Sequence, residues 1–267
     1  MLIWTDYEPG QHRIHCPACD GKKTLGITIE PDGKGVAHCF RCSFVESSRP
    51  GAVRLAPIYK AKPKVQKHER LNDWGQQIWR ECIPLSGVAL EYLKARHCYA
   101  PKYGDLQWHP ALKHPSGYVG AALVALITDI HTNEKMSLHR TWVTATGKAE
   151  IDSPRMLLGN HSIVGGVIRL WPDDEVNAVL GIAEGIETAL SMAWALQPVW
   201  ATIDANHMSQ FPVLRGIQTL VIGQDQDPAG IAAATTCAQR WAAAGKEVLV
   251  SRQTQNDLND VLKGATV

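Results

Sequence analysis

The alternation of apolar and polar residues predicts different secondary structure in successive stretches of the chain. Residues 24–30 and 33–40 alternate with the two-residue period of strands on either side of the turn PDGKG. Residues 71–87 and 86–97 have the wider spacing of amphipathic helices. A strand-rich stretch follows, in which two apolar runs flank the turn HTNEK. This turn predicts a second hairpin.

The C-terminal third has another pattern, in which short apolar strands alternate with helices. Strands are expected at residues 178–183, 198–204, 217–223 and 246–252, with helices between them and a short closing helix. Such alternation is typical of βαβ units and predicts a mostly parallel sheet flanked by helices. Functional groups in such sheets collect at the carboxyl ends of the strands.

The composition is that of an ordinary globular protein with more than one domain. The chain has 267 residues, of which 45% are hydrophobic and 20% are charged, whereas a single domain commonly holds roughly 100–200 residues. We find no run of about 18 apolar residues and no basic and apolar leader, and we expect a cytoplasmic protein without a membrane partner. The sequence also has no P-loop signature, which predicts that this chain carries no motor of its own.

Charge is divided unevenly along the chain, although the net charge is only +1. Residues 1–174 hold 22 basic and 17 acidic side chains, and residues 175–267 hold 5 basic and 9 acidic side chains. A basic part that binds nucleic acid and an acidic part that binds metal would give this division. Two solvated surfaces of unequal composition would give it as well, so both interpretations stay open.

Four of the seven cysteines form two C-x-x-C pairs, Cys16 with Cys19 and Cys39 with Cys42. The 19 residues between the pairs are a spacing typical of structural zinc. Two thiolates on one tight turn reach the same tetrahedral ion, and a second turn completes a Cys₄ site. Two disulfides are the alternative, which the lack of a secretory signal disfavours. We therefore predict a zinc ribbon that holds one structural Zn²⁺.

Carboxylates follow several of the predicted C-terminal strands. Glu184 comes directly after one strand, the pair Asp225 and Asp227 after another, and Asp257 after a third. Like charges gathered at one edge of a sheet repel one another without a cation, and ligation by oxygen alone favours Mg²⁺ or Mn²⁺. Helix capping is the other interpretation for any single one of them, and Asp225 or Asp227 is well placed to cap the helix that follows.

The stretches IAEGIETALS, VIGQDQDPAG and NDLND together resemble the Toprim domain of bacterial-type primases, topoisomerases and some nucleases. A Cys₄ ribbon ahead of this domain narrows the resemblance to primases. The middle stretch SLHRTWVTATGKA is similar to primases of bacteriophages, plasmids and integrated elements, so the resemblance covers nearly the whole chain. It implies catalytic and metal-binding roles for Glu184, Asp225 and Asp227, and Mg²⁺ or Mn²⁺ binding by Asp257.

One position departs from the family pattern. Many primases place an aspartate four residues after the first glutamate, where this chain has Thr188. Glu187 lies one residue earlier, and it either substitutes for that aspartate or favours the N-terminus of its helix. The sequence leaves both interpretations of Glu187 open.

The resemblance implies a DNA primase, an enzyme that synthesises short RNA primers on single-stranded DNA by metal-dependent nucleotidyl transfer. Its substrates would be ribonucleoside triphosphates, and Arg140 and Lys148 are predicted to contact nucleotide or template phosphates. The expected partner is a replicative helicase supplied in trans, and the expected location is the cytoplasm of a bacterial host cell. A Toprim-type metal-dependent nuclease and a non-catalytic zinc-ribbon DNA-binding replication factor are the alternatives.

These interpretations predict a multi-domain α/β protein. We expect a small β zinc ribbon, a mixed α+β primase subdomain, and a Toprim domain with a mostly parallel sheet flanked by helices. The predicted boundaries are residues 1–46 for the ribbon, 47–70 for a basic flexible linker, 71–172 for the N-terminal primase subdomain and 173–267 for the Toprim domain.

Overall fold

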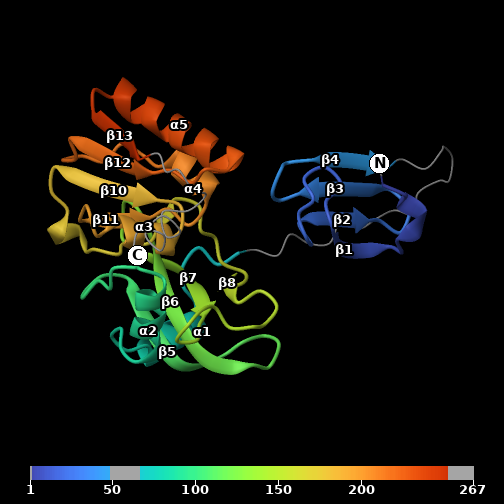
Figure 1. The fold of residues 1–267 in the computed structure, drawn as a ribbon, viewed down its shortest axis with the longest axis horizontal. Coiled ribbons are helices and arrows are strands. Elements are labelled where there is room, and N and C mark those ends of the chain that lie inside the picture. The colour runs from blue at the N-terminus through green and yellow to red at the C-terminus, as the bar shows by residue number, and fades with distance from the viewer. Residues whose placement is uncertain (1, 49–66, 252–267) are drawn as a thin grey trace, which may run out of the picture. The chain divides into compact units, whose positions relative to one another are not determined.

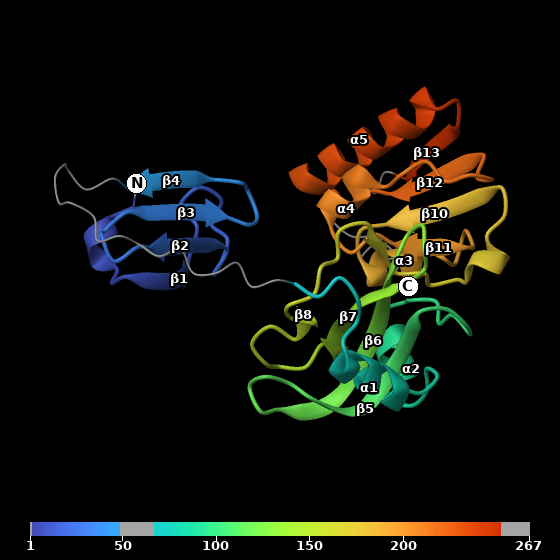
Figure 2. The same ribbon diagram turned by 180° about the vertical axis from the view of Figure 1, so that it is seen from behind.

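The computed structural model describes residues 2–48 and 67–251, which belong to two compact units, Met1–Lys64 and Val65–Val267 (Figures 1 and 2). Each unit has a hydrophobic core of its own. Most of the linker predicted over residues 47–70 lies outside the described residues. Among the described helices, none has the length and apolar character needed to cross a membrane.

The first unit is a four-stranded antiparallel sheet in the order β1-β2-β3-β4. Its two inner strands are those that the alternation predicts, and their buried side chains form the core. The outer strands are short and more polar, and neither was expected from the sequence. The elements are the 3₁₀ helix η1 (Trp4–Asp6), β1 (Gly10–Ile14), β2 (Leu25–Ile29), β3 (Gly35–Cys39) and β4 (Val45–Ser48).

The second unit begins with two helices and an antiparallel sheet in the order β5-β6-β7-β8, with β9 paired to β6. Helix α1 packs on one face of this sheet, where Ile78 joins the core around Leu138 and Trp142. Helix α2 packs on the other face through Tyr92 and Leu93. The elements are α1 (Asp73–Glu81), α2 (Val88–Ala95), β5 (Leu106–Lys113), β6 (Val119–Asp129), β7 (Lys135–Trp142), β8 (Arg155–Leu157) and β9 (Gly166–Val167).

A second, parallel sheet follows in the order β11-β10-β12-β13. The predicted parallel sheet flanked by helices is thereby confirmed, and with it the mixed α/β fold class. The elements are η2 (Asp173–Glu175), β10 (Val179–Ala183), α3 (Ile186–Met192), β11 (Val199–Ala201), α4 (Ala205–Gln210), β12 (Thr219–Gly223), α5 (Pro228–Ala243) and β13 (Glu247–Ser251).

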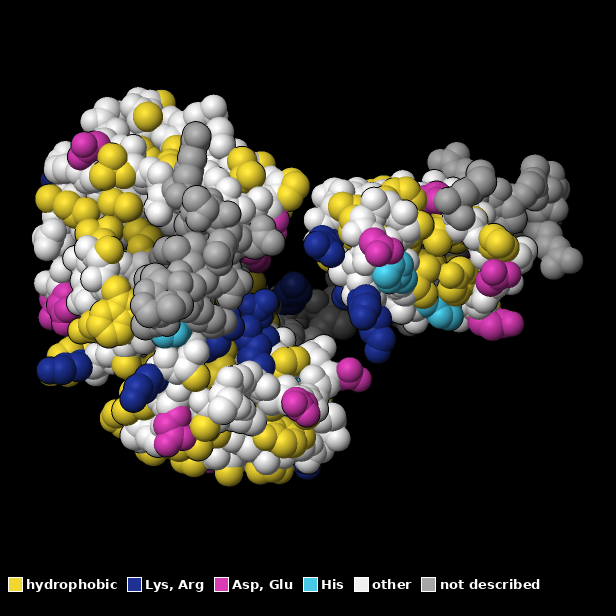
Figure 3. All heavy atoms as spheres, in the orientation of Figure 1, with side chains coloured by type: hydrophobic (Ala, Val, Ile, Leu, Met, Phe, Trp, Pro, Cys, Tyr) yellow, Lys and Arg dark blue, Asp and Glu magenta, His cyan; other side chains and the backbone are white. Residues whose placement is uncertain are grey.

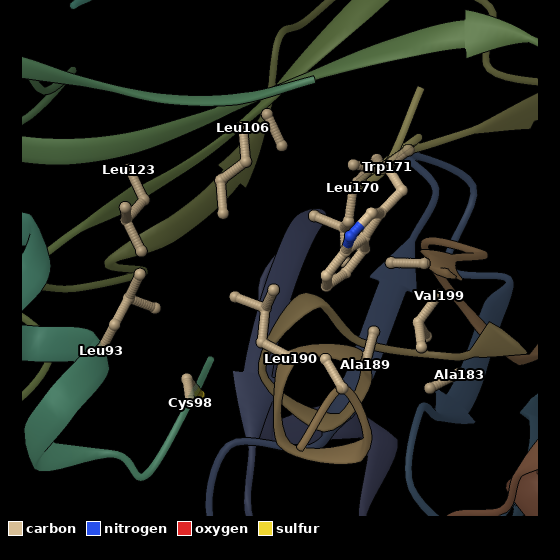
Figure 4. Close-up of a cluster of buried hydrophobic side chains, with 14 of the residues drawn as sticks. Leu93, Cys98, Leu106, Leu123, Leu170, Trp171, Ala183, Ala189, Leu190 and Val199 are labelled. Carbon is tan, nitrogen blue, oxygen red and sulfur yellow. The ribbon is translucent and has the colours of Figure 1, made fainter. Parts of the chain in front are cut away.

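The two faces of the parallel sheet have different neighbours. Helices α4 and α5 cover one face, and Met208 and Trp241 pack there against Leu180 and other strand side chains. Helix α3 covers the other face, and Leu190 lies in one continuous core with side chains of α2, β5 and β6 (Figure 4). The regions predicted as primase subdomain and Toprim domain therefore share a core, and α3 is the element between their two sheets.

Candidate functional site

The four predicted zinc ligands lie together in the first unit. The Sγ atoms of Cys16, Cys19, Cys39 and Cys42 all lie within 4.8 Å of one another, and all four cysteines are free of disulfides. Cys16 Sγ lies 3.7 Å from Cys42 Sγ, and Cys19 Sγ lies 3.7 Å from Cys39 Sγ. Thiolates placed tetrahedrally around Zn²⁺ at about 2.3 Å lie roughly 3.8 Å apart. The cluster therefore has the donor set and the size of a structural zinc site.

The backbone explains why both thiolates of each pair face the same point. The residue after each second cysteine is in the left-handed region, Asp20 with φ 58° and Ser43 with φ 58°. The N–H groups of these two residues donate at 3.0 Å to the carbonyls of Cys16 and Cys39, so both turns close in the same way. The Arg41 N–H also donates to Cys39 Sγ at 3.4 Å, a contact that favours the thiolate form.

Four carboxylates follow three neighbouring strands of the parallel sheet and form what we call the acidic edge. The register aligns Ala183 of β10 with Ala201 of β11 and with Gly223 of β12. Because the strands are parallel, the residues that follow them emerge at the same edge. The acidic edge consists of Asp204 after β11, Glu184 after β10, and Asp225 and Asp227 after β12. Asp257, the remaining predicted ligand, lies outside the described residues.

Glu184 shows how strongly these charges act on one another. Burial raises the pKa of its carboxyl group to about 7, and the charges of Asp225, Asp227 and Asp204 shift it in the same direction. The guanidinium of Arg155 opposes the shift. Carboxylates that raise one another's pKa by repulsion are stabilised in their ionised form by a divalent cation. A site with oxygen donors alone suits Mg²⁺ or Mn²⁺.

The spacing of the carboxylates bears on how they would hold such an ion. In the described ranges, the cysteine cluster is the only group of three or more ligand atoms lying within 4.8 Å of one another. Mg²⁺ commonly binds through one or two carboxylates and completes its shell with water and substrate phosphates. The acidic edge fits that mode of binding rather than a cage made of protein atoms alone.

Asp227 has the capping function that the sequence left open. Its Oδ1 accepts a hydrogen bond of 2.7 Å from the N–H of Gly230 and caps α5. Asp225 lies two residues earlier, in the turn between β12 and the helix. The cap uses one oxygen of Asp227, so capping and metal binding are compatible for this side chain.

The position of Asp225 depends on Gly230, and this dependence is testable. A Cβ atom at Gly230 would lie 2.9 Å from both Cβ and the carbonyl oxygen of Asp225, closer than packed atoms tolerate. Glycine to alanine normally stabilises a helix, but Gly230→Ala is expected to lower the free energy of unfolding by about 1–3 kcal/mol. Chemical denaturation measures the change, and Gly159→Ala is the matched control because its Cβ meets open space. A stability for Gly230→Ala equal to or above that of the wild type would contradict this placement.

The sequence analysis missed Asp204 as a member of the acidic edge. Its Oδ1 accepts from the backbone N–H of His207 at 2.8 Å and from Nδ1 of the same residue at 2.7 Å. His207 Nε2 also lies 2.7 Å from the carbonyl oxygen of Ile163, so both ring nitrogens face acceptors. Although burial opposes it, this pairing raises the pKa of His207. The available signal was an acidic residue at the end of an apolar strand, the same signal that identified Glu184.

Glu187 and Thr188, the two open positions, have different surroundings. Thr188 is buried in α3. The Glu187 carboxylate accepts from the hydroxyl of Tyr92 and from Arg96 Nη2 at 3.1 Å, and it pairs with Lys148 Nζ at 3.2 Å. The described contacts of Glu187 are therefore to cationic and hydroxyl groups of the preceding subdomain.

Basic side chains line the β7–β8 region. Figure 3 shows Lys and Arg side chains gathered over the part of the molecule where these strands lie. Arg140 is buried and donates to the Leu157 carbonyl at 3.0 Å, while its Nε has no hydrogen-bond partner among the described residues. Arg155 is exposed on β8 and acts on Glu184. Of the two predicted phosphate contacts, Lys148 is thus held by Glu187 and Arg140 is largely enclosed.

Two known families match successive parts of the second unit. Residues 179–265 match the Toprim domain family, and the chain therefore contains a Toprim domain, as its motifs predict. Residues 69–170 match a family described as a domain of unknown function, DUF7146. No curated protein matches the chain.

Several solved structures are similar to this chain at low identity. The primase fragment of the bacteriophage T7 primase-helicase is 15% identical with a TM-score of 0.46, and the alignment covers 96% of each chain. The zinc-binding and RNA polymerase domains of the Aquifex aeolicus primase are 15% identical with a TM-score of 0.48, covering 97% of this chain and 77% of that one. A DNA primase domain from Pseudomonas aeruginosa is 11% identical with a TM-score of 0.38, covering 67% of this chain and 56% of that one.

Proposed function

We propose that this protein is a DNA primase that synthesises short RNA primers on single-stranded DNA by metal-dependent nucleotidyl transfer. The observation that carries the proposal is the acidic edge of the Toprim domain, where Glu184 follows β10 and the charges of Asp225 and Asp227, which follow the neighbouring strand β12, act on it. A Cys₄ ribbon on the same chain supports a nucleic-acid substrate. The resemblance of the motifs to bacteriophage and mobile-element primases supports the same class of enzyme.

In this proposal Glu184, Asp225 and Asp227 hold one to three divalent ions at the acidic edge, with Asp257 as a further ligand. Bound Mg²⁺ or Mn²⁺ would neutralise the triphosphate and activate the attacking 3′-hydroxyl. The carboxylates fix where the ions sit, and this orients the reacting groups at little cost in reorganisation. Asp204 adds negative charge to the same edge.

The basic β7–β8 region would hold the anionic part of the substrate. Lys148 and Arg155 are the accessible candidates for triphosphate contacts, and Arg155 already acts electrostatically on Glu184. Arg140 would contribute through its Nε after a local rearrangement, because its guanidinium is enclosed in the present structure. The zinc ribbon would bind the template strand and help to select the start site. A separate helicase in the bacterial host cytoplasm would supply single-stranded DNA.

One assay separates this function from its two alternatives. The protein is incubated with single-stranded DNA, labelled ribonucleotides and Mg²⁺ or Mn²⁺. Short RNA products support the primase. Shortened DNA without RNA would identify a Toprim-type nuclease, and DNA binding with neither product would identify a non-catalytic replication factor.

The raised pKa of Glu184 predicts how the metal requirement changes with pH. A ligand must lose its proton before it binds metal, and this carboxyl group is half protonated at about pH 7. The Mg²⁺ concentration that gives half-maximal primer synthesis is therefore expected to be about tenfold higher at pH 6 than at pH 8. Asp204→Asn, which keeps the helix cap but removes one neighbouring charge, should move this dependence to lower pH. Equal Mg²⁺ requirements at both pH values would contradict the assignment.

A further inference from the structure

Glu187 is a partly buried carboxylate, and both of its oxygens have hydrogen-bond or ion-pair partners. Oε1 accepts from the Tyr92 hydroxyl and lies 3.2 Å from Lys148 Nζ, and Oε2 accepts from Arg96 at 3.1 Å and from Lys148 at 3.3 Å. Three donor groups thus surround a carboxylate that offers about four lone-pair sites. Although burial opposes it, the pairing with Lys148, Tyr92 and Arg96 lowers the pKa of Glu187. Glu187 is thus ionised, and both of its oxygens are engaged by cationic and hydroxyl groups.

The partners of Glu187 come from two different parts of the second unit. Tyr92 lies in α2, and Arg96 is the residue that caps the C-terminus of this helix. Lys148 lies after β7, where its backbone forms an antiparallel bridge with Val143. Glu187 itself is in α3, which begins two residues after Glu184. The network therefore ties the helix that follows the acidic edge to the turn that carries Lys148.

Lys148 is not the only cation near Glu187. Arg96 shares the same carboxylate, and Arg140 and Arg155 lie on the neighbouring strands β7 and β8. Burial and the charge of Arg155, with smaller contributions from Lys148 and Arg140, lower the pKa of the neighbouring His139 to about 4, and the charge of Glu187 opposes this shift. The Glu187 contacts thus fix the direction of Lys148 without removing the attraction of this region for anions.

We propose that Glu187 is a positioning residue that holds Lys148 toward the triphosphate of the incoming nucleotide, and that it is not a ligand of the catalytic metal. This inference rests on the proposed primase function. It explains why an acidic residue at this position of α3 is offset by one from the usual aspartate, with Thr188 buried in its place. Placing the acidic residue one position earlier in α3 directs its carboxylate to Tyr92, Arg96 and Lys148 of the preceding subdomain.

The test is a double-mutant cycle between Glu187→Gln and Lys148→Met, read by ATP binding and by primer synthesis. Glu187→Gln is expected to raise the KM for ATP about tenfold, equivalent to about 1.4 kcal/mol, and to change kcat less than threefold. In the Lys148→Met background the same substitution should change KM less than twofold, because its effect acts through Lys148. The half-saturating Mg²⁺ concentration should stay at its wild-type value. Glu91→Gln, an exposed site on α2, is the matched control and should leave all values unchanged.

The outcomes separate this inference from the proposed function. A rise in the Mg²⁺ requirement with Glu187→Gln would make Glu187 a metal ligand and overturn the inference. Additive effects of the two substitutions would overturn it as well. If the wild type binds ATP but makes no RNA, the primase function fails, while the cycle measured by ATP binding still decides the role of Glu187. A wild type that binds no ATP would overturn both.

Discussion

Asp225→Asn is expected to abolish primer synthesis while leaving the fold intact. Asparagine has the shape of aspartate but lacks the charge that a divalent cation requires, and Asp225 is the neighbouring charge that raises the pKa of Glu184 most. Loss of groups that merely support metal ligands costs roughly 10–100-fold, so loss of a direct ligand should cost more than about 100-fold in turnover. Primer synthesis from labelled ribonucleotides measures this effect.

A second measurement distinguishes the loss of a metal ligand from misfolding of the variant. The wild-type melting temperature should rise when Mg²⁺ is added, because an ion that binds the folded state stabilises it, and this rise should disappear in Asp225→Asn. Asp174→Asn, an exposed aspartate in η2, is the isosteric control and should behave as wild type. Primer synthesis by Asp225→Asn within a few-fold of wild type would show that this residue does not hold the catalytic metal.

The second large effect is expected from Cys39→Ser. The serine hydroxyl is a poor substitute for a thiolate, and a Cys₄ site that loses one ligand should lose its zinc. Because zinc binding supplies folding free energy in small metal-bound units, residues 1–48 should unfold, while the second unit, which has its own cores, should melt as in wild type. Zinc content per chain and hydrogen exchange of the two units measure the two parts of this prediction.

Cys82→Ser is the matched control for the zinc prediction. Cys82 is buried in the second unit and donates to the Ile78 carbonyl at 3.2 Å, a bond that a serine hydroxyl can also make. It should retain one zinc ion per chain, like wild type. Full zinc content in Cys39→Ser, or no zinc in the wild type, would contradict the assignment of the Cys₄ site.

Much of this architecture could be predicted because local patterns determine it. The spacing of the four cysteines indicated the ribbon, and the structure places all four thiols in one cluster. Apolar strands followed by helices indicated the parallel sheet, and strand ends in such a sheet share an edge. For that reason Glu184, Asp225 and Asp227 could be predicted to follow strands that end at one edge, and their functional role stays a prediction. The isolated Cys82, Cys98 and Cys237 are buried, as expected of small apolar side chains.

Other features depend on contacts between distant residues, and no local pattern encodes them. Strand β5 escaped prediction because Pro110 interrupts it, and the strand accommodates the proline at an irregularity between His109 and Leu112 on the edge of the sheet. The partners of Glu187 lie between 39 and 95 positions away in the sequence. The sequence left the function of Glu187 open because a residue at this position of α3 could contact either the acidic edge or the preceding subdomain. The packing of α3 against α2 places its carboxylate beside Tyr92 and Arg96.

We propose that the acidic edge holds the divalent ions of nucleotidyl transfer. The most direct measurement is anomalous diffraction from crystals of the full chain grown with Mn²⁺, a nucleoside triphosphate and a short template. We expect Mn²⁺ peaks at bonding distance from carboxylate oxygens of Glu184, Asp225 or Asp227 and from the triphosphate. A triphosphate bound with Mn²⁺ elsewhere in the chain, and no peak at the acidic edge, would contradict it.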